Sequence, residues 1–156
     1  MSQNNVRWGT DLRLLEDLEH QNDRNRGSDL FTRQRPETGK KDLETLSGTK
    51  NLQQALLLRF LTPVGELAIL GHPDYGSRLY ELIGELNNET NRNRAKLFVL
   101  QALAAEPRVK EVISVSVTQN RLNRTQIDID IFLMPIDSDT PLNLVFPFSL
   151  EGGAIA

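Results

Sequence analysis

The chain has 156 residues, enough for one ordinary domain with an additional segment. It contains no cysteine, which excludes disulfides, thiolate catalysis and metal sites that need sulfur ligands. It has 18 lysine and arginine residues and 21 aspartate and glutamate residues, so its formal net charge is -3. Because no excess positive charge is present to bind a phosphate backbone, we expect no nucleic-acid partner. No stretch approaches the roughly 18 apolar residues of a membrane helix and the N-terminus has no signal-peptide core, so we expect an intracellular, cytoplasmic protein.

The first part of the chain, residues 1–47, is polar and weakly patterned. Short strands are predicted within residues 8–15 and 27–32, while the stretches 16–26 and 33–41 are almost wholly polar. This pattern indicates an extended arm or hairpin that runs over the surface and orders against a partner. A flexible tail is an equally open alternative.

Three helices are expected in the middle of the chain. The first spans residues 51–61 and ends before Thr62-Pro63, because the residue before a proline avoids the helical region. A short helix is expected over residues 78–83, and a longer one runs from an asparagine cap at position 87 or 88 to just before Pro107. The inward stripe of the long helix has helical spacing and consists of Ala95, Phe98, Val99, Ala102 and Leu103.

The last third of the chain alternates apolar and polar residues, which predicts three strands at 111–119, 126–134 and 142–150. Each strand is expected to turn its apolar side chains to one face. These side chains are Ile113, Val115 and Val117 in the first strand, Ile127, Ile129, Ile131 and Leu133 in the second, and Leu142, Leu144, Phe146, Phe148 and Leu150 in the third.

Together these elements predict an α+β fold in which central helices pack on a C-terminal antiparallel sheet, with an extended N-terminal arm. The compact domain is expected to span residues 48–151, and residues 152–156 are expected to form a loose tail. Pro147 has no backbone N–H, which restricts the third strand to an edge or a bulge. The free main-chain groups of such an edge are a place where a strand of another protein can add to the sheet.

Motifs that carry enzyme chemistry are absent from the sequence. It has no phosphate-binding loop, no dinucleotide glycine motif, no Gly-x-Ser-x-Gly and no His-Glu-x-x-His. A glycosidase needs two carboxyl groups across a cleft, and nothing in the sequence brings two of the candidates together. The candidates are Glu66, Glu81, Glu85 and Glu106. We therefore expect no catalytic, cofactor-binding or metal-binding residues.

Two short sequence patterns suggest a function but have simpler explanations. The tripeptide His72-Pro73-Asp74 occurs in J-domain co-chaperones, but the basic helix that precedes it there is missing here, so we treat the match as coincidence. Asp128 and Asp130 share a strand face, which is typical of a solvated outer surface, and no third ligand nearby supports a calcium site.

Glu106 has an unusual position for a carboxylate. It lies at the C-terminal end of the long predicted helix, where the helix dipole disfavours negative charge by roughly 0.3–1 kcal/mol. Arg108 follows beyond a rigid proline, and its planar guanidinium is well shaped to pair with a carboxylate. The pair is either a surface ion pair of little energetic consequence or part of an ion-pair network between subunits. We favour the network.

Several segments of the sequence together resemble one family. They are Gly9-Thr10-Asp11, the stretch from Asn51 to Leu67, the stretch from His72 to Leu79, and Glu106-Pro107-Arg108 followed by a β-hairpin. The most specific parts are Thr-Pro-x-Gly-Glu-Leu, Pro-Asp-Tyr-Gly-Ser-Arg-Leu and Glu-Pro-Arg. The chain is similar, over about residues 8–150, to the baseplate wedge, or sheath-initiator, proteins of contractile phage tails and related injection machines. This family was long labelled "lysozyme-like" and includes the type VI secretion baseplate subunit.

The resemblance implies a structural component, repeated around a sixfold ring, that joins the wedge to the first sheath ring. The implied partners are the large baseplate wedge subunits and the sheath protein, with inner-tube or spike-hub proteins as further candidates, and no nucleic acid or small-molecule substrate. Glu106, Pro107 and Arg108 correspond to the family's wedge contact. Strand addition at the sheet edge, with Leu144, Phe146 and Phe148 supplying specificity, would initiate the sheath. The alternative is a peptidoglycan-cleaving enzyme, as the older family label suggests.

Overall fold

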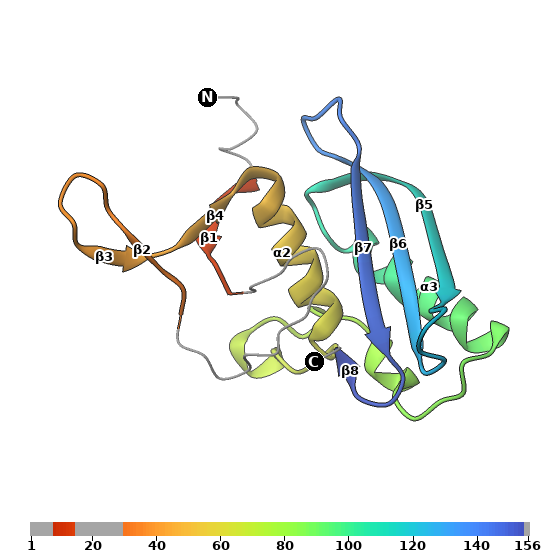
Figure 1. Ribbon diagram of the computed structural model, residues 1–156. Coiled ribbons are helices and arrows are strands. Elements are labelled where there is room, and N and C mark those ends of the chain that lie inside the picture. Colours follow the sequence, from red (N-terminus) through yellow and green to blue (C-terminus); the bar gives the residue numbers. More distant parts are fainter. Residues whose placement is uncertain (1–7, 15–29, 155–156) are drawn as a thin grey trace.

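The computed structural model describes residues 8–14 and 30–154 and has an α+β architecture, as predicted (Figure 1). Two helices, α2 (Gly48–Leu61) and α3 (Glu89–Ala104), pack against a C-terminal antiparallel sheet. The sheet has the strand order β5-β6-β7-β8. Its strands are β5 (Val109–Gln119), β6 (Gln126–Pro135), β7 (Leu142–Ser149) and β8 (Gly153–Ala154). None of the helices in the described part of the chain is both long and apolar enough to cross a membrane.

The two helices end where the sequence indicates. Helix α2 starts at Gly48, three residues earlier than predicted, and the Thr62 N–H closes its last turn by donating to the Leu58 carbonyl. Helix α3 is capped by Asn88, whose side chain accepts from the Asn91 N–H. Asn91 itself is buried, and its side chain donates to the Leu86 carbonyl.

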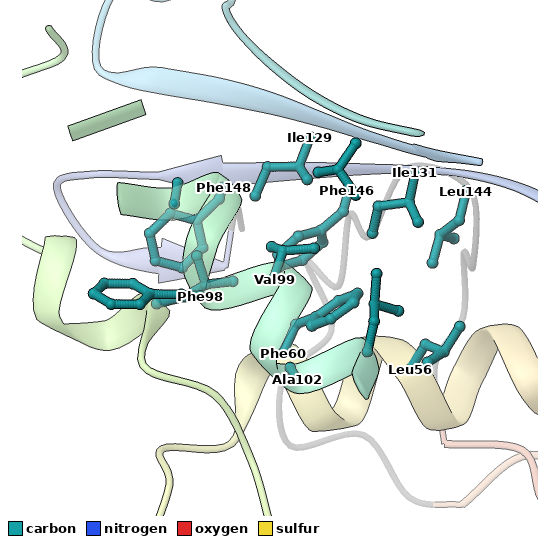
Figure 2. Close-up of a cluster of buried hydrophobic side chains, with 14 of the residues drawn as sticks. Leu56, Phe60, Phe98, Val99, Ala102, Ile129, Ile131, Leu144, Phe146 and Phe148 are labelled. Atoms are coloured by element: carbon teal, nitrogen blue, oxygen red, sulfur yellow. The ribbon is translucent and has the colours of Figure 1, made fainter. Parts of the chain in front are cut away.

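The core lies between the helices and one face of the sheet (Figure 2). All the predicted inward residues of α3, β6 and β7 are buried there. Phe146 lies at the centre: its ring centroid is 5.6 Å from that of Phe60 on α2 and 6.1 Å from that of Phe148. Burying large apolar side chains of this kind provides most of the driving force for folding, at roughly 25 cal/mol per Å².

Strand β5 departs from the predicted alternation. Its pairing register with β6 shifts between Val109 and Glu111 and again between Val112 and Ser114. The second shift leaves Ile113 without a partner residue, and this side chain is 46% exposed. The prediction that Ile113 shares the inward face of Val115 was therefore wrong. One extra residue in a strand turns the side chains that precede it to the opposite face of the sheet.

Strand β7 is an edge strand over most of its length. Residue Leu150, just beyond it, donates its N–H to Thr125 on the β6 side, so by alternation the backbone of Pro147 points away from β6. The missing N–H of Pro147 therefore costs no bond to β6, as the edge prediction required. Strand β8 covers only Phe148 and Ser149. The tail was expected to be loose from residue 152, but Gly153 and Ala154 form β8.

The connection from α2 to α3 contains two short 3-10 helices, η1 (Ala68–Leu70) and η2 (Leu79–Leu82). The second replaces the short helix predicted over residues 78–83. Before η2 the chain returns to the end of α2, where Ser77 forms a parallel bridge with Pro63. The Ser77 side chain also donates to the Phe60 carbonyl at 2.7 Å, so the return is fixed at the helix end.

The N-terminal part forms two short antiparallel strand pairs, and the strands at residues 41–43 and 45–47 were not predicted. Strand β1 (Thr10–Leu12) pairs with β4 (Thr45–Ser47), and β2 (Thr32–Gln34) pairs with β3 (Lys41–Leu43). The β2–β3 hairpin projects away from the helices and the sheet (Figure 1). The polar stretch 16–26 and the first residues of the strand predicted at 27–32 lie outside the described residues.

Candidate functional site

The candidate site is built around Glu106, which the sequence marks by its unusual position at a helix C-terminus. It lies two residues beyond the end of α3, and its side chain is only 3% exposed. Arg108 donates from Nε to Glu106 Oε1 at 2.6 Å, and the Arg108 backbone N–H donates to the same oxygen at 3.3 Å. Arg59, on α2, donates from Nη2 to Glu106 Oε2 at 3.2 Å. One carboxylate is thus held between two guanidinium groups.

Arg59 and Tyr75 bring the helix and the following connection into this site. Arg59 occupies a largely buried position on α2, and its guanidinium carbon lies 4.5 Å from the centre of the Tyr75 ring. A cation over an aromatic face is a favourable arrangement. The bridge between Pro63 and Ser77 holds the Tyr75 loop against the helix end, so the ring is placed by the main chain.

Trp8 connects the N-terminal part of the chain to the same site. Its indole N–H donates to the Ile136 carbonyl, in the connection between β6 and β7, at 3.0 Å. Its own carbonyl accepts from Asn51 Nδ2 at 2.9 Å and from Arg108 Nη1 at 3.4 Å. The side chain is buried, so this residue fixes the start of the described chain onto α2 and the end of the sheet.

The electrostatics of the cluster favour a charged carboxylate. Burial acts to raise the pKa of Glu106. Arg108 has the opposite effect through its side-chain hydrogen bond, its charge and its backbone N–H, and the charge of Arg59 adds to it. Together these effects outweigh burial and hold the pKa of Glu106 below its ordinary value. Burial raises the pKa of Tyr75, so its hydroxyl stays protonated and able to donate. A general acid in a glycosidase needs the opposite shift from the one at Glu106.

The structure brings Glu106 and Arg108 together, but within one chain. We predicted that Glu106 and Arg108 both contribute to an ion-pair network between subunits. For Glu106 this prediction is corrected, because its carboxylate is buried and already bound by two arginines of the same chain. Arg108 is different, since its side chain is 24% exposed. Pro107, between them, is exposed. The surface that a partner can reach is therefore formed by Pro107 and Arg108.

The three strand residues predicted to contact a partner lie elsewhere. Leu144, Phe146 and Phe148 are all buried against the helices. Their side chains serve the core, so the expectation that they supply specificity to an added strand is corrected. The exposed side chains of the same strand are those of Asn143 and Val145. Strand addition at the main chain of this edge stays a prediction.

The remaining candidate carboxylates do not join Glu106. Glu81 forms an ion pair with Arg78 on the surface and lies 3.9 Å from Arg94. Glu66 and Glu85 are exposed. Among the described residues, no group of three or more histidine, aspartate or glutamate side chains is placed to hold a metal ion.

Sequence reasoning missed Arg59, Tyr75 and Trp8. Arg59 is the one charged residue of the helix predicted over residues 51–61. This was a usable signal, since burying a guanidinium requires a carboxylate partner. Tyr75 and Trp8 gave no comparable signal, because their contacts depend on how distant parts of the chain meet.

Comparison with solved structures gives an informative similarity. The chain resembles a crystal structure from Geobacter sulfurreducens described as a "putative tail lysozyme". The two are 27% identical with a TM-score of 0.54, and the match covers 62% of this chain and 85% of the other. No family model matches the chain, and no curated protein matches it.

Proposed function

We propose that this chain is a structural, non-enzymatic component of the baseplate of a contractile phage tail or related injection system. The observation that carries the proposal is the similarity to the Geobacter sulfurreducens chain, which extends over 85% of that chain. The segments that resemble baseplate wedge proteins in the sequence support the same conclusion. They include Glu106-Pro107-Arg108, which the structure places at one site with Arg59.

In this role the exposed part of the site contacts the large wedge subunits. Pro107 and Arg108 form the accessible surface, and Glu106 holds the Arg108 guanidinium in a fixed orientation from below. A planar guanidinium held in this way is suited to a directional contact with a partner. Several copies around a sixfold ring would present this contact repeatedly.

The second contact is the free edge of β7, where a sheath strand would add to the sheet. By alternation from Leu150, the backbone groups of Asn143 and Val145 point away from β6. No described residue bonds these outward groups. Main-chain bonds at such an edge supply affinity and register to an added strand. Inner-tube or spike-hub proteins are further candidate partners of the same assembly.

Val145→Pro tests this contact. The change removes an outward N–H without removing a bond to β6, so the isolated protein keeps its fold while sheath no longer assembles on the baseplate. Val145→Ala, which keeps the N–H, is the matched control and should assemble sheath normally. Electron microscopy of particles from cells that carry each variant is the measurement. Normal sheathed particles with Val145→Pro would reject strand addition at β7.

The alternative function is cleavage of peptidoglycan, which the older family label and the description of the Geobacter sulfurreducens chain both suggest. The lowered pKa of Glu106 argues against this residue as the general acid. Purified protein incubated with cell walls decides between the two functions. Release of soluble muropeptides above a buffer control would favour the enzyme and contradict a purely structural role.

A further inference from the structure

The site around Glu106 contains more positive than negative charge. Arg59 and Arg108 share one carboxylate, and neither has a second acidic partner among the described residues. Arg59 Nε is the one buried side-chain nitrogen or oxygen of those residues that has no hydrogen-bond partner. Arg108 uses Nε and Nη1 for bonds within the chain, and its Nη2 donates to no described residue. Arg59 Nε is buried, so it carries a desolvation cost without a partner. Arg108 Nη2 belongs to a side chain that is 24% exposed, so a ligand can reach that side chain.

Tyr75 adds a third donor beside the two arginines. Its ring centre lies 4.5 Å from the Arg59 guanidinium carbon, and Arg59 shares the Glu106 carboxylate with Arg108. The residue is half-buried, and its hydroxyl forms no hydrogen bond with any described residue. A neutral donor and two cations therefore meet at one place, with only one anion between them.

We propose that Tyr75, Arg59 and Arg108 form a binding site for one carboxylate of a partner protein. The partner presents an aspartate or glutamate side chain, which accepts from Arg108 Nη2 and from the Tyr75 hydroxyl. The positive charge of the buried Arg59, which Glu106 partly neutralises, adds to the attraction for this carboxylate. This inference rests on the proposed function, since it specifies the chemistry that a wedge subunit brings to the site.

A protein carboxylate fits the site better than a phosphate group. The local excess is one positive charge, which a single carboxylate neutralises, whereas a phosphate carries about two negative charges near neutral pH. The chain as a whole carries a net charge of -3, so it does not attract polyanions in general. The guanidinium of Arg108 is held by Glu106 and the Trp8 carbonyl, and such preorganisation lowers the entropic cost of binding.

Photo-crosslinking of assembled particles tests the inference. Tyr75 is replaced by benzoylphenylalanine in the full chain, and Tyr80, the chain's other tyrosine, is replaced in a matched control. After irradiation, mass spectrometry identifies the partner segment attached to each position. The account predicts a crosslink from position 75 to a partner segment that contains an aspartate or glutamate within about one helical turn, and none to that segment from position 80. A crosslinked segment without an acidic residue would overturn the proposal.

The second measurement compares the partner affinity of the wild-type chain with that of a variant lacking only the Tyr75 hydroxyl. Tyr75→Phe removes only the hydroxyl, so we expect the binding of the purified chain to the isolated wedge complex to weaken about tenfold, as for one hydrogen bond to a charged group. Tyr80→Phe should leave binding unchanged. Replacing the crosslinked partner acid with its amide should weaken wild type by more than Tyr75→Phe does, because the pairing with Arg108 is lost as well, and this replacement should cost less when the chain carries Tyr75→Phe. Unchanged binding of Tyr75→Phe would reject the site.

The two proposals fail differently in these experiments. If the wild-type chain is absent from sheathed particles, the proposed function fails and the partner carboxylate has no source. If the wild-type chain is present but the Tyr75 variants bind and crosslink as the Tyr80 variants do, the chain is a baseplate component and only the carboxylate site is wrong.

Discussion

Glu106 illustrates how one residue can join distant parts of a chain. It accepts hydrogen bonds from α2 through Arg59 and from the start of the sheet through Arg108, which in turn bonds the Trp8 carbonyl. Removing a buried charge from water is costly, and only close partners offset that cost. Such an ion pair therefore contributes less to net stability than to a unique arrangement of helix, sheet and N-terminal part. Its loss is nonetheless expensive, because the partners that remain are left buried and unpaired.

Glu106→Gln should therefore lower the free energy of unfolding by about 3 kcal/mol at neutral pH. Because folding lowers the pKa of this carboxyl, its stabilisation is fully present above the pKa of the unfolded chain, about 4.3. It is lost as the pH falls through the lower folded-state pKa. Urea unfolding of wild type and variant at a series of pH values should show the two curves converging under acidic conditions.

Glu81→Gln is the matched control, since Glu81 also pairs with arginine but on the surface. It should cause a much smaller loss, because exposed ion pairs contribute little. Equal losses from the two variants would contradict the buried network.

At the scale of elements, two of the segments that resemble the family in sequence cross each other at the end of α2. The Thr62–Leu67 segment leaves α2, and the Pro73–Leu79 segment returns to it. The Ser77 N–H donates to the Thr62 carbonyl at 2.9 Å, and the Val64 N–H donates to the Ser77 carbonyl at 3.0 Å. Gly76 permits this crossing, because its φ of 113° suits glycine. The crossing also positions Tyr75 over Arg59.

Gly76→Ala should therefore damage the fold. A Cβ atom there would lie 2.4 Å from the Thr62 carbonyl oxygen, and that oxygen belongs to main chain that cannot rotate away. We expect a loss of about 3 kcal/mol or more in the free energy of unfolding. Gly71→Ala is the control, because Gly71 also has a positive φ but no atom within 4 Å of the added Cβ. It should cost about 1–2 kcal/mol. Similar melting temperatures for the two variants would contradict the close approach.

The sequence predicts the regular elements well and their long-range contacts poorly. Strands β6 and β7 have a regular apolar alternation, and helices α2 and α3 are bounded by clear caps and prolines, so each appears within a few residues of its predicted bounds. The bulge at Ile113 was not predictable from alternation, because the pattern of apolar residues around it is regular. Strand β8 is too short and glycine-rich to give a strand signal.

The candidate site was predicted only in part, for a related reason. Arg108 is two residues from Glu106, so their pairing was visible in the sequence. Arg59 is 47 residues away from Glu106. Its role follows from the packing of α2 against the chain between α3 and β5, and no local pattern encodes that packing. The burial of Phe146 and Phe148 agrees with their alternation, which places them on the core face and away from a partner.

For the whole molecule, the arrangement leaves two separate surfaces for partners. One sheet face is covered by the helices, and β7 keeps a free edge along most of its length. Pro107 and Arg108 form a second surface where α2 meets the chain between α3 and β5, with the buried side chains of Arg59 and Glu106 behind it. The β2–β3 hairpin extends away from both the helices and the sheet (Figure 1). Two such surfaces on one small chain suit the proposed role of joining neighbouring components of an assembly.

The most direct measurement follows the native chain to its assembly. A short affinity tag is added, cells are lysed gently, and the tagged chain is separated by sedimentation and imaged by electron microscopy. The account predicts that the chain sediments with a large tail-like particle and lies at the baseplate end of its sheath. Sedimentation only as a small free species, without sheath protein, would contradict the account and restore cell-wall cleavage as the leading function.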